Sequence, residues 1–460
     1  MIYENKVKIL RDKPLLILAV ITLAMAIAWL FYAFLGHEFI RAAHEGALSA
    51  PFNRIIENHN IYILEYDFKI LDSALVKVSI FIYFLIGLAL SIKLFYRYKI
   101  GRFLIVLSTY LISAFLILHV FMQTWGFRGD EERLGFKQMM THTAHKPFAF
   151  RVLVPMLVNS SSSLFPSDFI DSHKEWLTET SPLIKYVQMK DFSDARVSLK
   201  YHLTYLYVSL SLVILLFSTR YLIKLIYNLP SIVSDIAPAI GILFLPLTFL
   251  HGGYFYDFFE LMFLALCLIC IVRRKWVFYY TLFFLAILNK EPNILLILFF
   301  MAFCQGVLPK KELMKHLAMQ LFIGVITVQL LWHIFAGNPG MTIEHHLTGS
   351  IHFWLRPTSY FLFFDPYHLG FPIFPRGGNI LSILFVGFLV FYKWGQKPLS
   401  LRWLFVYTSI VNISLLLYAC HIDELRNLSF MFPSVYLLGV YSIYSLIYKT
   451  RLNKVPRHES

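Results

Sequence analysis

The chain has 460 residues, of which 58% are hydrophobic, 17% are aromatic and 15% are charged. This composition excludes a soluble enzyme, a disordered protein and a secreted disulfide scaffold, because a water-facing surface cannot accommodate so many apolar side chains. The net charge of +14 first suggests a nucleic-acid partner, yet Lys and Arg also mark the cytoplasmic ends of membrane helices. The sequence therefore predicts an all-α integral membrane protein.

Apolar runs near the bilayer-spanning length of about 20 residues recur along the whole chain. They predict about twelve transmembrane helices in a single polytopic membrane domain over residues 1–460. In chain order the predicted spans are 14–36, 75–96, 103–125, 203–226, 236–250, 255–272, 277–288, 293–308, 316–336, 379–396, 401–421 and 428–448.

Lys and Arg are concentrated in alternate connections between these spans. If the N-terminus is cytoplasmic, most of the surplus positive charge lies on the cytoplasmic side and the opposite side is slightly acidic. This asymmetry predicts that both termini are cytoplasmic. It also accounts for the basic balance of the chain without nucleic acid.

The connections on the predicted outer side are much longer than those on the inner side. The long loops are about 37–74, 126–202 and 337–378, and the first contains an amphipathic stretch that predicts a helix lying in the membrane interface. We therefore expect the function to be carried out at the outer face. No internal repeat divides the chain, which weighs against a transporter built from two similar halves.

The segment 251–260 joins two spans through a glycine turn and carries two acids. Asp257 and Glu260 are three residues apart, which places them on one face of a helix. They could simply be acids favoured by the helix dipole at an N-terminus. However, a charge within the hydrocarbon layer costs at least about 2.5–3.5 kcal/mol, which favours a functional role for Glu260 among its apolar neighbours.

Asn289-Lys290-Glu291-Pro292 interrupts two apolar runs that are each short for a span. Broken backbone inside a membrane persists where protein or a water-filled cavity surrounds it. Lys290 and Glu291 could form a pair that merely caps a kink, or they could face a polar cavity open to the outer side. We favour the cavity, since a lipid-substrate enzyme needs one.

A tight outer turn before the last span contains Asp423, Glu424 and Arg426. These residues could pair with one another or face the same cavity. Glu344-His345-His346 in the third outer loop could ligate a metal, but adjacent histidines in a loop are more often simply polar. No zinc signature, Walker loop, dinucleotide fingerprint or nucleophile elbow occurs. The sequence therefore predicts no cofactor, and no motif supports a divalent metal.

An enzyme at the outer face has no nucleotide sugars, so an activated donor must arrive on a lipid, typically as a polyprenyl phosphate. Such a donor requires Arg or Lys for its phosphate and a carboxylate that takes the proton of the acceptor hydroxyl. The candidate catalytic residues are Glu38, Asp257, Glu260 and Glu291. The candidate substrate-binding residues are Arg133, Arg151, His251, Tyr256, Lys290, Asp423, Glu424 and Arg426.

The acid that ends span one, the long outer loops and the outer polar residues resemble the GT-C superfamily of polyprenyl-phosphate-sugar-dependent glycosyltransferases. Short motifs also resemble those of bacterial multi-span proteins grouped with it: KPFAFRVL at 146–153, YDFFEL at 256–261, LNKE at 288–291 and DELR at 423–426. In that superfamily the catalytic acid is usually an aspartate near the end of span one. Here Glu38 holds that place, and the first aspartate of the loop is Asp67.

The resemblance implies a GT-C-like fold in the bacterial inner membrane. It further implies a glycosyltransferase that moves a sugar from a polyprenyl-phosphate carrier to a cell-envelope glycan or lipid at the periplasmic face. The expected partners are the lipid-linked donor, the glycan or lipid acceptor and membrane lipids. The alternatives are a transporter or flippase of a lipid-linked or anionic substrate, and an outer-face polymerase or ligase of glycans.

Overall fold

The computed structural model describes residues 99–129, 131–187, 190–227, 229–248, 253–362, 378–420 and 424–448. All regular elements in these ranges are helices, which confirms the predicted all-helical character for the described part of the chain. The predicted spans 14–36 and 75–96, the first outer loop and both termini lie outside the described residues.

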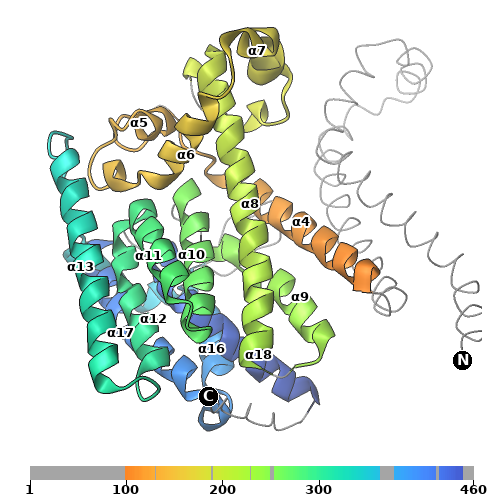
Figure 1. Ribbon diagram of the computed structural model, residues 1–460, viewed down its shortest axis with the longest axis vertical. Coiled ribbons are helices and arrows are strands. Elements are labelled where there is room, and N and C mark those ends of the chain that lie inside the picture. The colour runs from red at the N-terminus through yellow and green to blue at the C-terminus, as the bar shows by residue number, and fades with distance from the viewer. Residues whose placement is uncertain are drawn as a thin grey trace, which may run out of the picture. The chain divides into compact units, whose positions relative to one another are not determined.

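Long helices alternate with short helical turns (Figure 1). The described elements are α4 (Lys99–Thr124), α5 (Phe136–Met140), η1 (Phe148–Phe150), α6 (Leu153–Ser162), α7 (Ser167–Ser172), η2 (Trp176–Thr180), η3 (Ile184–Tyr186), η4 (Lys190–Ser193), α8 (Ala195–Ile226), α9 (Ser231–Ile242), η5 (Leu245–Thr248), α10 (Phe255–Val272), α11 (Trp276–Asn289), η6 (Glu291–Leu295), α12 (Leu296–Cys304), α13 (Lys310–Ile334), α14 (Leu347–Trp354), η7 (Pro357–Phe361), α16 (Ile380–Phe391), η8 (Trp394–Gln396), α17 (Leu399–Ala419), η9 (Leu425–Met431) and α18 (Phe432–Tyr448).

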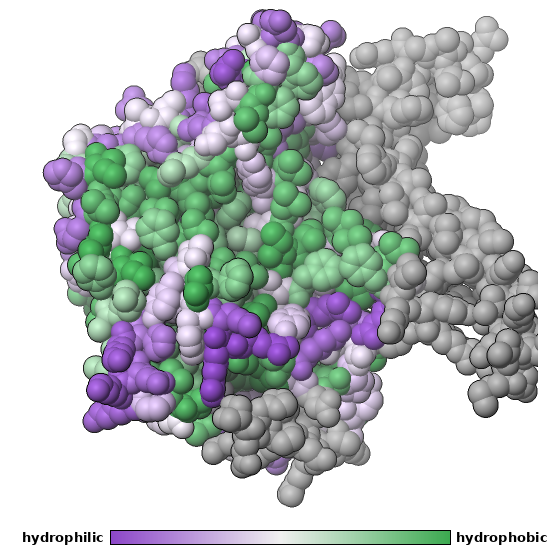
Figure 2. Space-filling model, in the orientation of Figure 1, coloured by the Kyte–Doolittle hydropathy of each residue, from purple (hydrophilic) through white to green (hydrophobic). Residues whose placement is uncertain are grey.

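Six helices in the described ranges are long and apolar enough to cross a membrane. They are Gly101–Thr124, Ala195–Ile226, Phe255–Val272, Lys310–Ile334, Leu399–Ala419 and Leu425–Tyr448. Four further apolar helices, α9, α11, η6–α12 and α16, are shorter than a full span. On the face shown in Figure 2, hydrophobic residues form a band between hydrophilic residues above and below it, as expected for a chain that crosses a bilayer.

Helix α10 forms the centre of the bundle. It packs against α8, α11 and α12 and is also in contact with η9. Apart from two acids near its start, it is apolar on every side, so it can be surrounded by other helices, and Phe258, Leu264 and Cys267 are fully buried. Polar groups on α10 are consequently shielded from both water and lipid.

The chain breaks its helix between α11 and α12 at Lys290. Pro292 lies in the short η6 turn, where it cannot donate a backbone hydrogen bond. The amide of Asn289 donates to the carbonyl of Tyr256 at 2.9 Å, and that of Asn293 donates to the carbonyl of Ala286 at 2.8 Å. Side-chain amides therefore satisfy carbonyl groups around the break and fix it against the start of α10.

A layer of short helices lies at one end of the bundle, where α5, α6 and α7 appear at the top of Figure 1. The amide of Asn338 donates to the carbonyls of His142 and Ala144 at 2.9 and 2.8 Å. The backbone N–H of Lys146 donates to Pro339, and that of Val152 donates to Leu288. These bonds attach the loop before α6 to the end of α13 and to the end of α11.

Candidate functional site

The first two turns of α10 carry the two acids at the centre of the site. The Asp257 carboxylate accepts a hydrogen bond from the backbone N–H of Tyr254 at 3.0 Å, so it caps the helix that it belongs to. Glu260 follows one turn later on the same face. Both residues are buried, with 4% and 0% of their surface exposed. The cap and the burial hold the two carboxylates in fixed positions.

Lys290, at the helix break, lies between these two carboxylates. Its ammonium nitrogen is 3.1 Å from Oδ1 of Asp257 and 2.6 Å from Oε2 of Glu260. All three side chains are shielded from solvent. The break after α11 therefore places the ammonium group of Lys290 next to the acids of α10, although Lys290 lies about thirty residues further along the chain.

The η9 turn contributes a second cation and a hydroxyl group. Nη1 of Arg426 donates to Oδ2 and Oδ1 of Asp257 at 3.1 and 3.4 Å. The Ser429 hydroxyl donates to Oε1 of Glu260 at 3.0 Å. We define the ionic cluster as Asp257, Glu260, Lys290, Arg426 and Ser429.

A second ion pair lies beside the ionic cluster. Arg151, at the end of η1, contacts the carboxylate of Glu291 at the start of η6. The ring of Tyr256 lies near both sites, at 5.4 Å from the Arg151 guanidinium carbon and 5.8 Å from the Lys290 nitrogen. Burial lowers the pKa of Arg151, an effect that Tyr256 opposes, and arginine remains charged despite such a shift.

Tyr254 forms the edge of the ionic cluster next to the start of α10. Its ring stacks on that of Tyr256, with centroids 5.1 Å apart, and the guanidinium carbon of Arg426 lies 4.5 Å from its centre. The other guanidinium nitrogen of Arg426 is 3.6 Å from Oε1 of Glu424. Arg426 therefore links a buried acid to a less buried one.

The arrangement places several charges where hydration is lost, and it compensates them by pairing. An ionised group without a partner at such depth would cost several kcal/mol. Asp257 has two cationic partners and a backbone N–H, whereas Glu260 has one cationic partner and a hydroxyl group. Glu260 is therefore the less compensated of the two carboxylates, and it is better suited to accept a proton.

The predicted site residue Arg133 has its ion-pair partner outside this cluster. Arg133 is half exposed and pairs with Glu344, which also contacts His346 at 3.2 Å. Glu38, His251 and Asp423 lie outside the described residues. Among the residues that the structure describes, no group of three His, Cys, Asp or Glu side chains could hold a metal ion.

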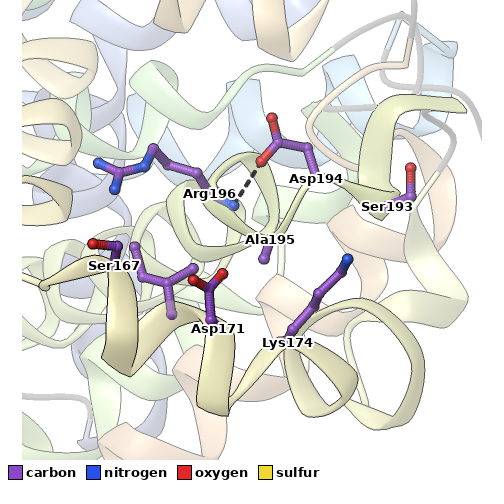
Figure 3. A pocket seen from close by; sticks show the side chains of 8 residues that line it. Ser167, Asp171, Lys174, Ser193, Asp194, Ala195 and Arg196 are labelled. Atoms are coloured by element: carbon purple, nitrogen blue, oxygen red, sulfur yellow. Dashed lines mark hydrogen bonds between the residues drawn. The ribbon is translucent and has the colours of Figure 1, made fainter.

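A cavity of about 280 Å³ lies in the layer of short helices, between α7 and the start of α8. Figure 3 shows charged side chains of both signs around it, including Asp171, Lys174 and Asp194. Asp194 accepts from the backbone N–H of Arg196 and serves as the N-cap of α8. No residue of the ionic cluster lines this cavity. We place the candidate site at the cluster, because several of the predicted site residues meet there.

Sequence reasoning missed two polar residues: Ser429, which bonds Glu260 of the ionic cluster, and Arg128, which lies over the Tyr254 ring. Ser429 carries no motif, and its only signal is helical spacing of three residues from Arg426. Arg128 directly follows an apolar run and the turn residue Gly126, a position where a cation can lie at the membrane surface.

Comparison of the chain with protein-family models, curated proteins and solved structures finds no match. The class of the protein is therefore described from its helices and its buried ionic cluster. The described part of the chain is a helical protein with several helices that could span a membrane, and a buried ionic cluster lies at one end of its central helix.

Proposed function

We propose that this protein is a membrane glycosyltransferase that moves a sugar from a polyprenyl-phosphate carrier to a cell-envelope glycan or lipid. The observation that carries the proposal is the convergence of acids and bases from α10, the α11–α12 break and η9 in one buried cluster. Buried ionisable groups in a membrane protein indicate function, because their burial is costly.

The residues present match the needs of such a reaction. Arg151, Lys290 and Arg426 are cations for the phosphate of the donor. Glu260 takes the proton of the acceptor hydroxyl, and the oxygen of that hydroxyl bonds to the anomeric carbon of the sugar. The bond between that carbon and the phosphate oxygen breaks, and the electron pair leaves with the polyprenyl phosphate.

The cationic ends of the helices support placing this site at the outer, periplasmic face of the bacterial inner membrane. The ionic cluster lies at the start of α10, whereas Arg273 and Arg274 follow the end of the same helix. The start of α13 carries Lys310 and Lys311, and its end contacts the layer that holds Arg151. By the positive-inside rule, we expect the end with Arg273 to face the cytoplasm. We further propose that both termini lie on that side and that the chain has about twelve spans.

The test is sugar transfer by the full-length protein in nanodiscs supplied with polyprenyl-phosphate sugars and an envelope-glycan acceptor. We expect Glu260→Gln to reduce turnover at least a hundredfold, since general-base catalysis contributes about 10²–10⁴. The matched control is Glu312→Gln. Glu312 is an exposed acid in the first turn of α13, away from the end that contacts the layer of short helices, so this variant should have the turnover of the wild type. Absence of transfer from every donor tested would refute the proposal.

A second candidate function is transport of a lipid-linked or anionic substrate, and it is favoured by the helix break at Lys290. Discontinuous helices with charged residues at the break are common at transporter binding sites. Uptake or flipping of a labelled polyprenyl-phosphate sugar in proteoliposomes, without any chemical change in it, would favour this candidate over the transferase.

A further inference from the structure

Arg128 occupies a strained position beside the outer edge of the ionic cluster. It follows α4 with a φ of +64°, in the left-handed region that arginine rarely adopts. Its guanidinium carbon lies 4.2 Å from the centre of the Trp125 ring and 4.9 Å from that of the Tyr254 ring. Two aromatic faces therefore hold the guanidinium in place.

Two guanidinium groups lie against Tyr254, and both have unused donors. Arg426 lies 4.5 Å from the same ring. The Nε atoms of Arg128 and Arg426 are both buried and have no hydrogen-bond acceptor among the described residues, and Arg426 as a whole is only 9% exposed. A buried N–H without an acceptor costs free energy, which an anion that accepts hydrogen bonds from these groups would recover.

Arg128 differs from the other cations of the site in its partners. Lys290, Arg151 and Arg426 each contact a carboxylate. No carboxylate in the described part of the chain pairs with Arg128, whose recorded contacts are the two aromatic rings. Its charge is thus oriented by packing and left available to a ligand.

We propose that Arg128 and Arg426 form a subsite for a phosphate group next to Tyr254. This inference rests on the proposed function, because it assigns the phosphate of the lipid carrier to these residues. Phosphate fits the donor set, since guanidinium groups bind its oxygens in a planar, bidentate geometry and an aromatic stack orients that plane. Arg426 also donates to Asp257 of the ionic cluster, so a sugar attached to this phosphate would lie near the buried acids.

The experiment measures binding of undecaprenyl phosphate and of inorganic phosphate to the full-length protein in nanodiscs. We expect Arg128→Gln to weaken binding of the lipid about tenfold or more, as for loss of a charged hydrogen bond. Arg128→Asn should do the same, and it keeps the backbone fold because asparagine tolerates a positive φ. Binding of inorganic phosphate with the same dependence on Arg128 identifies the phosphate group as the shared determinant, and binding of the lipid alone shows that the chain is also required.

The matched control is Arg273→Gln at the other end of α10. Arg273 also lies over a tyrosine ring, at 5.4 Å from Tyr221, so this variant removes a comparable cation and ring contact away from the subsite. We expect it to bind both probes like the wild type. Wild-type affinity in both Arg128 variants, or no binding of either probe to the wild type, overturns the inference.

Failure of this inference is distinguishable from failure of the proposed function. If the lipid binds through Arg128 but no sugar is transferred, the subsite stands and the transferase proposal fails. If transfer occurs and Arg128→Gln leaves the KM for the donor unchanged, the transferase proposal stands and the subsite fails.

Discussion

Lys290 determines whether the buried acids of α10 remain compensated, because it is the one cation in the described ranges that pairs with Glu260. We expect Lys290→Met to lower the free energy of unfolding by about 3–5 kcal/mol, the usual cost of leaving one member of a buried ion pair alone. Adding Glu260→Gln should recover part of that loss, since it removes the unpaired charge. Denaturant unfolding in detergent measures both, and a single variant as stable as the wild type would contradict the expectation.

Gly340 is a second residue whose role follows from local geometry. Its φ is +90°, and a Cβ atom there would lie 2.7 Å from the carbonyl oxygen of Lys146. We expect Gly340→Ala to destabilise the protein by about 1–3 kcal/mol, because a backbone atom cannot move aside easily. Gly337→Ala is the control, since a Cβ at that glycine meets no atom within 4 Å. Equal thermal stability of the two variants would argue against this explanation.

At the scale of elements, apolar periodicity and length locate most of the described helices. The predicted span 255–272 coincides with α10, and 277–288 closely matches α11. Helix α8, however, begins at Ala195 and not at 203, because its first turns are polar and capped by Asp194. Hydropathy detects the part of a helix that lies in lipid and misses the turns that project beyond it.

The candidate site is less accessible to sequence reasoning than the helices are. The segments holding Asp257, Lys290 and Arg426 stand out one by one, because charges interrupt apolar runs. Their pairing joins residues 33 and 169 positions apart, and local patterns carry no information about contacts at that separation. For the same reason local patterns do not reveal Arg128, which lies over the ring of Tyr254, the residue before α10.

The end of α16 depends on a buried lysine, which makes its stability sensitive to pH. The Lys397 ammonium donates to the carbonyls of Leu389 and Val390 at 2.8 and 2.6 Å, and burial lowers its pKa to about 8. Below pH 8 the lysine is charged in the folded and unfolded states, so the cost of burying the charge is fully present. Between pH 8 and its ordinary pKa of 10.5 the unfolded state binds more protons, so stability rises with pH.

The variant that tests this pH dependence is Lys397→Met, because methionine has no titratable group at this position. We expect its unfolding free energy, measured in detergent from pH 7 to pH 10, to rise less steeply than that of the wild type. A parallel rise in both proteins would mean that another group causes the pH dependence.

At the scale of the whole molecule, the net charge of +14 is informative through the positions of the Lys and Arg residues along the chain. Along α10 alone, acids mark one end and Arg273 and Arg274 mark the other. The positive-inside rule uses only the cations, and it predicts that the end of α10 followed by Arg273 and Arg274 faces the cytoplasm. We therefore predict, from the same charges that make the chain basic, that the ionic cluster lies on the side away from the cytoplasm.

This orientation is testable with single cysteines at two exposed glycines. A side chain at Gly337, after α13, or at Gly395, between α16 and α17, meets no atom within 4 Å, so Gly337→Cys and Gly395→Cys should fold normally. The background replaces the four native cysteines by serine or alanine. A membrane-impermeant maleimide added to spheroplasts should label Gly337→Cys at once, whereas Gly395→Cys should require permeabilisation. The reverse labelling would place the ionic cluster on the cytoplasmic side, where a polyprenyl-phosphate donor offers no advantage over a nucleotide sugar.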